Sequence, residues 1–208
     1  GFTNEGGVNN TIRFLRNIMG MWLLERCRES WASQDLPVDY SELLDLAAAA
    51  QPFQSIINPD DNRFLNPPDM PETIAEFCRR TGQTIPETTG AFVRCIFESL
   101  AFKYRFVIEM INSLRPVSID MLHIVGGGSQ NKVLNQFIAN ALGIPVVAGP
   151  AEGTAIGNIL MQAVSEGEIE DIDSGRKIVA DSFSLELLEP RDHEQWNKQY
   201  KKVKSFLN

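Results

Sequence analysis

The chain has 208 residues, 43% of them hydrophobic, which is enough to bury a core as one domain or as a compact pair. Nineteen lysines and arginines against 27 aspartates and glutamates give a net charge of −8. No basic run offers a track for a phosphate backbone, so we expect no nucleic-acid partner. No segment reaches the ~18 uninterrupted apolar residues of a membrane span and no signal-peptide pattern is present. We therefore expect a cytoplasmic protein with no membrane partner.

The first half of the chain is predicted to be mostly helical. After a polar, glycine-bearing loop at Thr3–Asn10, apolar residues at helical spacing predict a helix from Thr11 to about Cys27. Between residues 53 and 71, Asn-Pro and Pro-Pro pairs predict turns around a short strand at Ile56–Ile57. Three further helices are predicted at Asp39–Ala50, Glu72–Thr81 and Glu87–Leu114.

Cysteine usage and the first residue give two further expectations. Cys27, Cys78 and Cys95 lack the spacing of metal ligands and are expected to be ordinary reduced thiols. Pairing of Cys78 with Cys95, on neighbouring predicted helices, is the less favoured alternative. Because the chain begins with Gly1 in a polar stretch rather than with Met, we expect it to be a piece of a longer protein.

The most informative segment is Met121–Leu142. A short apolar run ends in Gly126, Gly127 and Gly128 and continues into a predicted amphipathic helix. A strand that leads through glycines into a helix N-terminus places unpaired N–H groups and the positive end of the helix dipole at one point. Without Cβ atoms, the glycines also let a flat or anionic ligand approach the main chain. This combination favours a nucleotide.

A second strand and glycine-rich turn follow directly. Residues 143–147 predict a strand, and the turn at Gly149–Asn158 leads into a helix whose apolar residues, such as Ile159 and Leu160, share one face. In an α/β sheet both turns open at the carboxyl ends of the strands, where such folds bind ligands. The remaining elements are predicted as a helix at Asp171–Ala180, an extended segment at Phe183–Leu188 and a terminal helix at about Asp192–Phe206.

Common nucleotide motifs do not explain the glycine turn. The dinucleotide fingerprint needs a third glycine where this chain has Asn131, and the following strand ends without an acid. The G-x-x-x-x-G-K-[ST] phosphate loop is absent. A tight strand-to-helix turn without any ligand is the competing interpretation, and Ser129 is expected to cap the helix in either case.

Acids elsewhere give weaker signals. Asp60 and Asp61 lie in a proline-bounded turn, where turn formation and solvation are favoured over catalysis. We assign no catalytic base and no metal ligand in this chain.

Six stretches carry a resemblance to a known family. They are TNEGG (3–7), RNIMGMWLLERCR (16–28), IINPDDNRFLNPPDMP (56–71), RCIFESLA (94–101), HIVGGGSQN (123–131) and GPAEGTAIGN (149–158). Together they resemble the C-terminal half of the bacterial rhamnulokinase branch of the FGGY carbohydrate kinase family. GGGSQN alone is shared by many sugar kinases of that family, and the stretches other than the one that contains it are more specific.

The resemblance implies an α/β fold of the actin-like (ribonuclease H-like) ATPase type, with a mixed sheet flanked by helices. Residues 1–208 would be the C-terminal, ATP-binding domain of a two-domain kinase whose sugar-binding N-terminal domain is absent from this chain. The implied reaction transfers the γ-phosphoryl group of ATP to the 1-hydroxyl of L-rhamnulose, giving L-rhamnulose 1-phosphate and ADP, with Mg²⁺ bound through the nucleotide phosphates. The catalytic base would lie upstream, so the isolated fragment is expected to be inactive.

Site residues are carried over onto matching positions. HIVGGGSQN matches the adenosine-binding motif of the family, which implicates Gly126, Gly127, Gly128, Ser129 and Asn131, with Gly127 as the foremost nucleotide contact. Asn17 matches a polar position that faces the sugar. Glu25 matches a position that lines the nucleotide site and often carries Gln. Because a carboxylate would repel phosphates, we expect Glu25 to face the adenosine side or solvent.

Three other functions stay open at the level of sequence. The chain could belong to a related kinase for another ketose or polyol, to an actin-like nucleotide-dependent regulator without a sugar substrate, or to a glycine-rich α/β scaffold that binds partners. The sequence does not define an oligomeric state.

Overall fold

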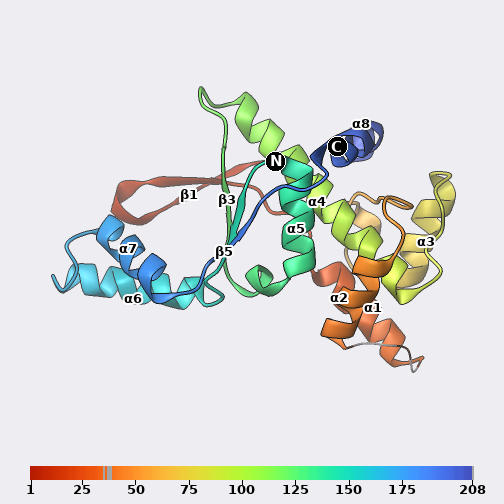
Figure 1. Cartoon of the computed structure of the whole chain (residues 1–208), viewed down its shortest axis with the longest axis horizontal. Coiled ribbons are helices and arrows are strands. Elements are labelled where there is room, and N and C mark those ends of the chain that lie inside the picture. Colours follow the sequence, from red (N-terminus) through yellow and green to blue (C-terminus); the bar gives the residue numbers. More distant parts are fainter. Residues whose placement is uncertain (35, 37–38, 208) are drawn as a thin grey trace. The chain divides into compact units, whose positions relative to one another are not determined.

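The computed structural model describes residues 1–34, 36 and 39–207. The chain is an α/β protein with two compact units, one made of Gly1–Pro116 with Asn197–Asn208 and the other of Val117–Trp196. Each unit has its own sheet, a two-stranded β1-β2 sheet in the first and a three-stranded β3-β4-β5 sheet in the second (Figure 1). In the described part of the chain, no helix is long and apolar enough to cross a membrane.

The first unit opens with a β-hairpin that the sequence reading missed. β1 (Thr3–Gly6) pairs antiparallel with β2 (Ile12–Leu15), and a cross-strand ion pair joins Glu5 to Arg13 at 2.9 Å. The connection contains a short 3-10 turn, η1 (Val8–Asn10), in which Asn9 and Asn10 both have positive φ, a conformation that asparagine adopts more readily than most residues.

The predicted loop at 3–10 and the predicted start of a helix at Thr11 are therefore wrong. Ile12 and Phe14 fitted a helical stripe, yet in the structure they lie on the same face of an exposed strand, and Ile12 is 72% exposed. The predicted helix begins only at Trp22 (α1, Trp22–Ala32), so Gly20 lies in the loop before it.

Three further helices of the first unit agree with the predicted ranges to within about two residues. They are α2 (Tyr40–Ala49), α3 (Met70–Arg80) and α4 (Thr89–Ser113). The residue before each helix is a capping Asp or Thr, whose side chain accepts a hydrogen bond from a first-turn N–H. Helix α2 packs along α4, and α1 packs against α3. The core of this unit includes Leu23, Leu24, Leu43, Ile57, Phe64, Ile74, Ile96, Phe97 and Leu100.

The short strand predicted at Ile56–Ile57 does not form. The N–H of Ile56 donates to Gln83 Oε1 at 2.8 Å, and the N–H of Ile57 donates to Ser99 Oγ at 2.9 Å. Side chains thus satisfy the buried backbone that a neighbouring strand would otherwise have paired. The segment continues into the short 3-10 turn η2 (Asn62–Phe64).

The end of the chain is anchored on α4. Helix α8 (His193–Val203) and the 3-10 turn η4 (Lys204–Phe206) follow the predicted terminal helix. The Tyr200 hydroxyl donates a hydrogen bond to the Glu109 carboxylate at 2.8 Å, and the Arg105 guanidinium lies 4.0 Å from the centroid of the Tyr200 ring.

All three cysteines are free and buried, as expected for reduced core thiols. The interaction with Cys78, together with burial, raises the pKa of Cys95. Burial also raises the pKa of Cys27.

The second unit is built on a mixed sheet. β3 (Leu122–Ile124) and β4 (Val146–Ala148) are parallel, with Leu122 opposite Val146, and β5 (Glu186–Leu188) runs antiparallel to β4. Helix α5 (Lys132–Leu142) packs against β4 and β5. It ends at Gly143, whose left-handed φ of 71° suits the glycine cap of a helix C-terminus.

Two more helices complete this unit, α6 (Gly153–Ser165) and α7 (Ile172–Ser182), and they pack against each other. Both helices were predicted. The apolar face expected on α6 is only partly covered by the described residues of this unit, because no residue of α6 is fully buried and Ile159 is 65% exposed.

The packing of α2 against α4 yields a test of the first unit. A Cβ added at Gly90 would lie 2.7 Å from the carbonyl oxygen of Leu46, a backbone atom that cannot swing aside. Replacing a helical glycine by alanine normally raises the free energy of unfolding by up to ~1 kcal/mol, but overpacking of this kind lowers it by about 1–3 kcal/mol. We expect Gly90→Ala to lower the thermal unfolding midpoint. Gly157→Ala, in α6 with no atom within 4 Å of the new Cβ, is the control and should not lower it. Equal midpoints for the two variants would contradict this packing.

Candidate nucleotide site

The glycine turn follows β3, as the sequence predicted. Gly126 has a φ of 80°, a conformation that favours glycine, and Gly127–Gln130 form the 3-10 turn η3 before α5 begins at Lys132. Gly127 and Gly128 are exposed. A Cβ added at Gly127 would have no atom within 4 Å, so the space over this residue is open to a ligand.

The cap of α5 differs from the prediction. Asn131, not Ser129, is the N-cap, and its side-chain oxygen accepts a hydrogen bond from the N–H of Leu134 at 3.0 Å. Ser129 instead lies inside η3 and donates its hydroxyl to the carbonyl oxygen of Gly126 at 2.8 Å. The extra 3-10 turn moves the helix start two residues along the chain. Both residues are buried, and their hydrogen bonds stabilise the conformation of the turn.

The two glycine-rich turns lie side by side, as predicted. The N–H of Gly126 donates to the carbonyl oxygen of Pro150 at 3.0 Å, and the N–H of Gly149 donates to the carbonyl oxygen of Ile124 at 2.8 Å. The unpaired N–H groups that the sequence predicted at this turn therefore do not include that of Gly126. Its amide joins the two turns and leaves Gly127 and Gly128 as the glycines that can face a ligand.

A cavity of about 430 Å³ adjoins the turn within the second unit. This volume falls within the range of small-molecule sites. Phe183, Ser184 and Glu186 contribute to it because β5 pairs with β4, with Glu186 opposite Ala148. The sequence reading missed these residues, although the predicted extended segment at 183–188 was a usable signal. The other lining residues are Ser129, Gln130, Lys132, Ala148, Gly149, Pro150, Ala151 and Glu152.

The two other predicted site residues belong to the first unit. Glu25 lies in the first turn of α1, and its carboxylate accepts hydrogen bonds from Arg28 at 2.8 and 3.1 Å. This ion pair offsets the negative charge that made a carboxylate unexpected beside phosphates. Asn17 is exposed in the loop between β2 and α1.

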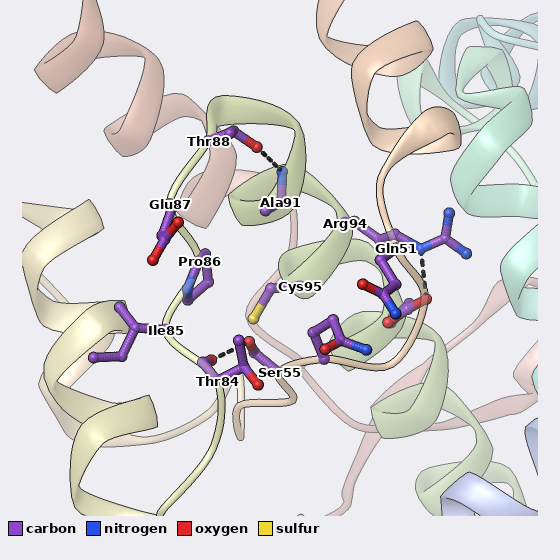
Figure 2. Close-up of a pocket in the computed structure, with 12 residues that line it drawn as sticks. Gln51, Ser55, Thr84, Ile85, Pro86, Glu87, Thr88, Ala91, Arg94 and Cys95 are labelled. Carbon is purple, nitrogen blue, oxygen red and sulfur yellow. Dashed lines mark hydrogen bonds and ion pairs between the residues drawn. The ribbon is translucent and has the colours of Figure 1, made fainter.

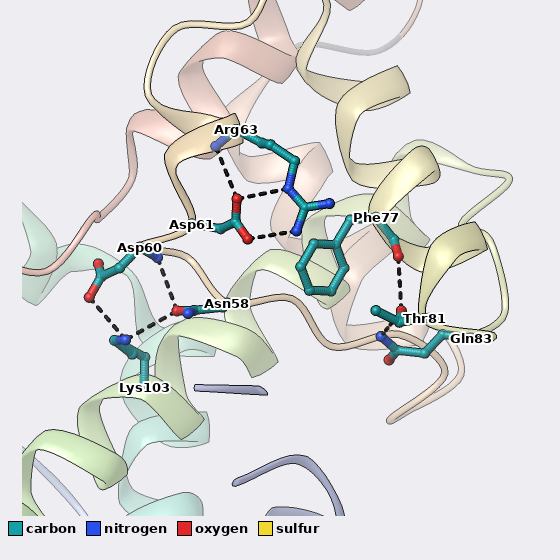
Figure 3. Close-up of polar contacts among 8 residues, drawn as sticks. All are labelled: Asn58, Asp60, Asp61, Arg63, Phe77, Thr81, Gln83 and Lys103. Carbon is teal, nitrogen blue, oxygen red and sulfur yellow. Dashed lines mark hydrogen bonds and ion pairs between the residues drawn. The ribbon is translucent and has the colours of Figure 1, made fainter. Parts of the chain in front are cut away.

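Asp60 and Asp61 have separate partners, shown in Figure 3. Asp61 accepts from the backbone N–H of Arg63 at 3.0 Å and forms an ion pair with the Arg63 guanidinium at 2.6 Å. The hydrogen bond from Arg63 lowers the pKa of Asp61. This is the predicted turn role. Asp60 instead pairs with Lys103 of α4 at 3.0 Å, which the sequence did not indicate.

A second cavity, of about 290 Å³, lies in the first unit near the start of α4 (Figure 2). Two of its charged lining residues are paired with each other, since Arg94 donates to Glu98 at 2.8 Å, and Arg94 also donates to three carbonyl oxygens at the end of α2. Glu98 is 1% exposed and also accepts from the N–H of Phe53. Burial raises the pKa of Glu98 to about 7, against the opposing effect of Arg94. These pairs hold α2 and the 50–53 segment against α4.

An open glycine turn at the carboxyl ends of two parallel strands, beside a cavity of ligand size, is the arrangement that α/β nucleotide-binding proteins use. Residues 1–166 match the family described as "FGGY family of carbohydrate kinases, C-terminal domain". The chain belongs to the FGGY family of carbohydrate kinases.

Two curated relatives of this chain are rhamnulokinases. The chain is 53% identical over 199 residues to the rhamnulokinase of Bacteroides thetaiotaomicron, covering 96% of this chain and 40% of the relative. It is 43% identical over 193 residues to that of Bacillus subtilis, covering 92% of this chain and 39% of the relative. The chain thus spans about two fifths of the length of the relatives it matches.

Solved structures support the fold. A xylulose kinase from Rhodospirillum rubrum matches with a TM-score of 0.61 at 19% identity, over 88% of this chain and 36% of that one. Plasmodium falciparum glycerol kinase with ADP matches with a TM-score of 0.67 at 16% identity, over 100% of this chain and 42% of that one. The predicted fold class, an α/β C-terminal domain of a two-domain kinase with a mixed sheet, is confirmed.

The corrected helix cap can be tested directly. Asn131→Ala removes the side-chain acceptor for Leu134 and should destabilise the protein by ~1 kcal/mol, the usual cost of a lost N-cap. Asn131→Asp keeps an acceptor at the same position and should retain most of the stability. Thermal unfolding of both variants is the measurement. A neutral Asn131→Ala would show that α5 is not capped at this position.

Proposed function

We propose that residues 1–208 are the C-terminal, ATP-binding domain of a kinase that transfers the γ-phosphoryl group of ATP to the 1-hydroxyl of L-rhamnulose. The products are L-rhamnulose 1-phosphate and ADP. The observation that carries the proposal is the open turn at Gly127, in a chain that shares 53% and 43% identity with two rhamnulokinases.

Gly127 and Gly128 are proposed to receive the nucleoside end of ATP. Three neighbouring residues stabilise the conformation of the turn. Gly126 donates a hydrogen bond to Pro150, the Ser129 hydroxyl donates one to Gly126, and Asn131 caps α5. A rigid glycine surface lets a flat ring approach the main chain without displacing a side chain. The ligand then meets a preformed site and loses less free energy to ordering the protein.

Glu25 is proposed to line the nucleotide site with its carboxylate held by Arg28, and Asn17 to face the sugar. Mg²⁺ is proposed to bind through the phosphates of ATP, where it offsets their charge during transfer. Among the described residues no group of three or more His, Cys, Asp or Glu side chains could hold a metal ion. We propose that the carboxylate that accepts the hydroxyl proton lies in the part of the relatives that this chain does not span. A cytoplasmic location is proposed with this function.

The glycine turn is tested by Gly127→Leu in the enzyme at the length of its relatives. Gly127 has no unusual φ and no neighbouring atom within 4 Å of a new Cβ, so the variant should fold. Its side chain would occupy the space proposed for the nucleoside, and we expect the Kd for ATP–Mg²⁺ to rise at least about tenfold, or ~1.4 kcal/mol. Calorimetric titration is the measurement. Gly157→Leu, another open glycine, is the control and should bind like wild type. Equal affinities for Gly127→Leu and wild type would remove the basis of the proposal.

The substrate is tested with a panel of sugars and polyols. We expect kcat/KM for L-rhamnulose to exceed that for D-xylulose, gluconate and glycerol by at least about a hundredfold, because hydrogen-bonding sites strongly reject analogues that leave them unpaired. A higher value for one of the other compounds would favour the related-kinase alternative. Nucleotide binding without phosphorylation of any acceptor would favour the actin-like regulator.

A further inference from the structure

The segment that carries Asn17 has no regular secondary structure of its own. Residues 16–20 connect β2 to α1 as an irregular loop, and Asn17 is exposed on it. A side chain on a loop can bind a substrate in a defined geometry only if other residues hold the loop in place. The contacts of its two flanks therefore decide where Asn17 lies.

One carboxylate contacts both flanks of Asn17. Asp60 Oδ1 accepts a hydrogen bond from the backbone N–H of Met19 at 2.9 Å. Asp60 Oδ2 lies 3.9 Å from the guanidinium of Arg16. One contact precedes Asn17 in the chain and the other follows it, so together they restrain the backbone on both sides of this residue.

The carboxylate is itself held by a buried cation. Lys103 Nζ lies 3.0 Å from Asp60 Oδ2, and the Lys103 side chain is 1% exposed. The same ammonium donates to Asn58 Oδ1 at 3.1 Å and to the carbonyl oxygen of Leu207 at 2.7 Å. Asn58 in turn accepts from the N–H of Asp60 at 3.2 Å (Figure 3). Because Lys103 is on the long helix α4, Asp60 connects the loop to the core of the first unit.

The neighbouring acid shows that this arrangement is specific to one residue. Asp61 is turned toward Arg63 and shares none of the hydrogen bonds or ion pairs to Met19, Arg16 or Lys103. Both acids sit in the same turn, so general damage to that turn would follow from either substitution.

We propose that Asp60 is a positioning residue for sugar binding, which acts through Met19 and Arg16 to hold the Asn17 loop in place. It does not contact the substrate. This inference rests on the proposed function, because it assigns the sugar contact to Asn17.

The test compares Asp60→Ala, Asp60→Asn and the matched control Asp61→Ala in the enzyme at the length of its relatives. With Asp60→Ala, KM for L-rhamnulose should rise at least about tenfold while KM for ATP changes less than about twofold. Asp60→Asn keeps an oxygen acceptor for Met19 and should recover part of that loss. Asp61→Ala should leave KM for the sugar within about twofold of wild type. If Asp60→Ala and Asp61→Ala change both KM values alike, Asp60 has only a structural role and the proposal is wrong.

Hydrogen exchange provides a readout that does not depend on the sugar. Exchange of the Met19 amide should accelerate at least about tenfold in Asp60→Ala, less in Asp60→Asn, and not in Asp61→Ala. Unchanged exchange in Asp60→Ala would overturn the proposal. If Asp60→Ala does not fold, the exchange rate and sugar KM of Asp60→Asn decide, and wild-type values for both would overturn it. A wild-type enzyme that does not phosphorylate L-rhamnulose would disprove the proposed function, and the exchange experiment would still decide whether Asp60 holds the loop.

Discussion

Parallel pairing of β3 with β4 brings both glycine-rich turns of the second unit to the same end of one sheet, and the candidate site depends on it. Adjacent parallel strands end at the same edge, where the hydrogen bonds from Gly126 to Pro150 and from Gly149 to Ile124 join the turns. The Gly126 amide is therefore occupied by a structural hydrogen bond, whereas the space over Gly127 remains accessible to a ligand. The antiparallel addition of β5 then brings Phe183 and its neighbours to the adjoining cavity.

In the first unit, helix α4 has a comparable organising role. Its inward charges all have partners, namely Arg94 with Glu98, Lys103 with Asp60 and Arg105 with Glu109. Two of these pairs lie within α4 itself, and additional hydrogen bonds reach the segments packed on it. Arg94 donates to three carbonyl oxygens at the end of α2, and Glu109 accepts from the Tyr200 hydroxyl. Asp60, paired with Lys103, holds the loop that carries Asn17. Glu109, which accepts a hydrogen bond from Tyr200, holds the end of the chain.

Long periodic elements and the glycine turns could be predicted from the sequence, because local spacing determines them. The hairpin β1-β2 could not be separated from a helix by apolar spacing, since Ile12 and Phe14 are exposed and fit both periods. The adjacent Asn9 and Asn10, which adopt positive φ, were the signal that was overlooked. The cap at Asn131 follows from a 3-10 turn that apolar spacing does not indicate. The Asp60–Lys103 pair joins residues that are distant in sequence, so no local pattern indicates it.

The proposed function depends on a nucleoside-binding surface at Gly127. The most direct measurement is a crystal structure of the enzyme, at the length of its relatives, with a non-hydrolysable ATP analogue and Mg²⁺. We expect the adenosine to lie against the main chain at Gly127 and Gly128, with the Gly126–Pro150 hydrogen bond intact. Adenosine bound elsewhere, with side chains packed over the glycine turn, would contradict the account.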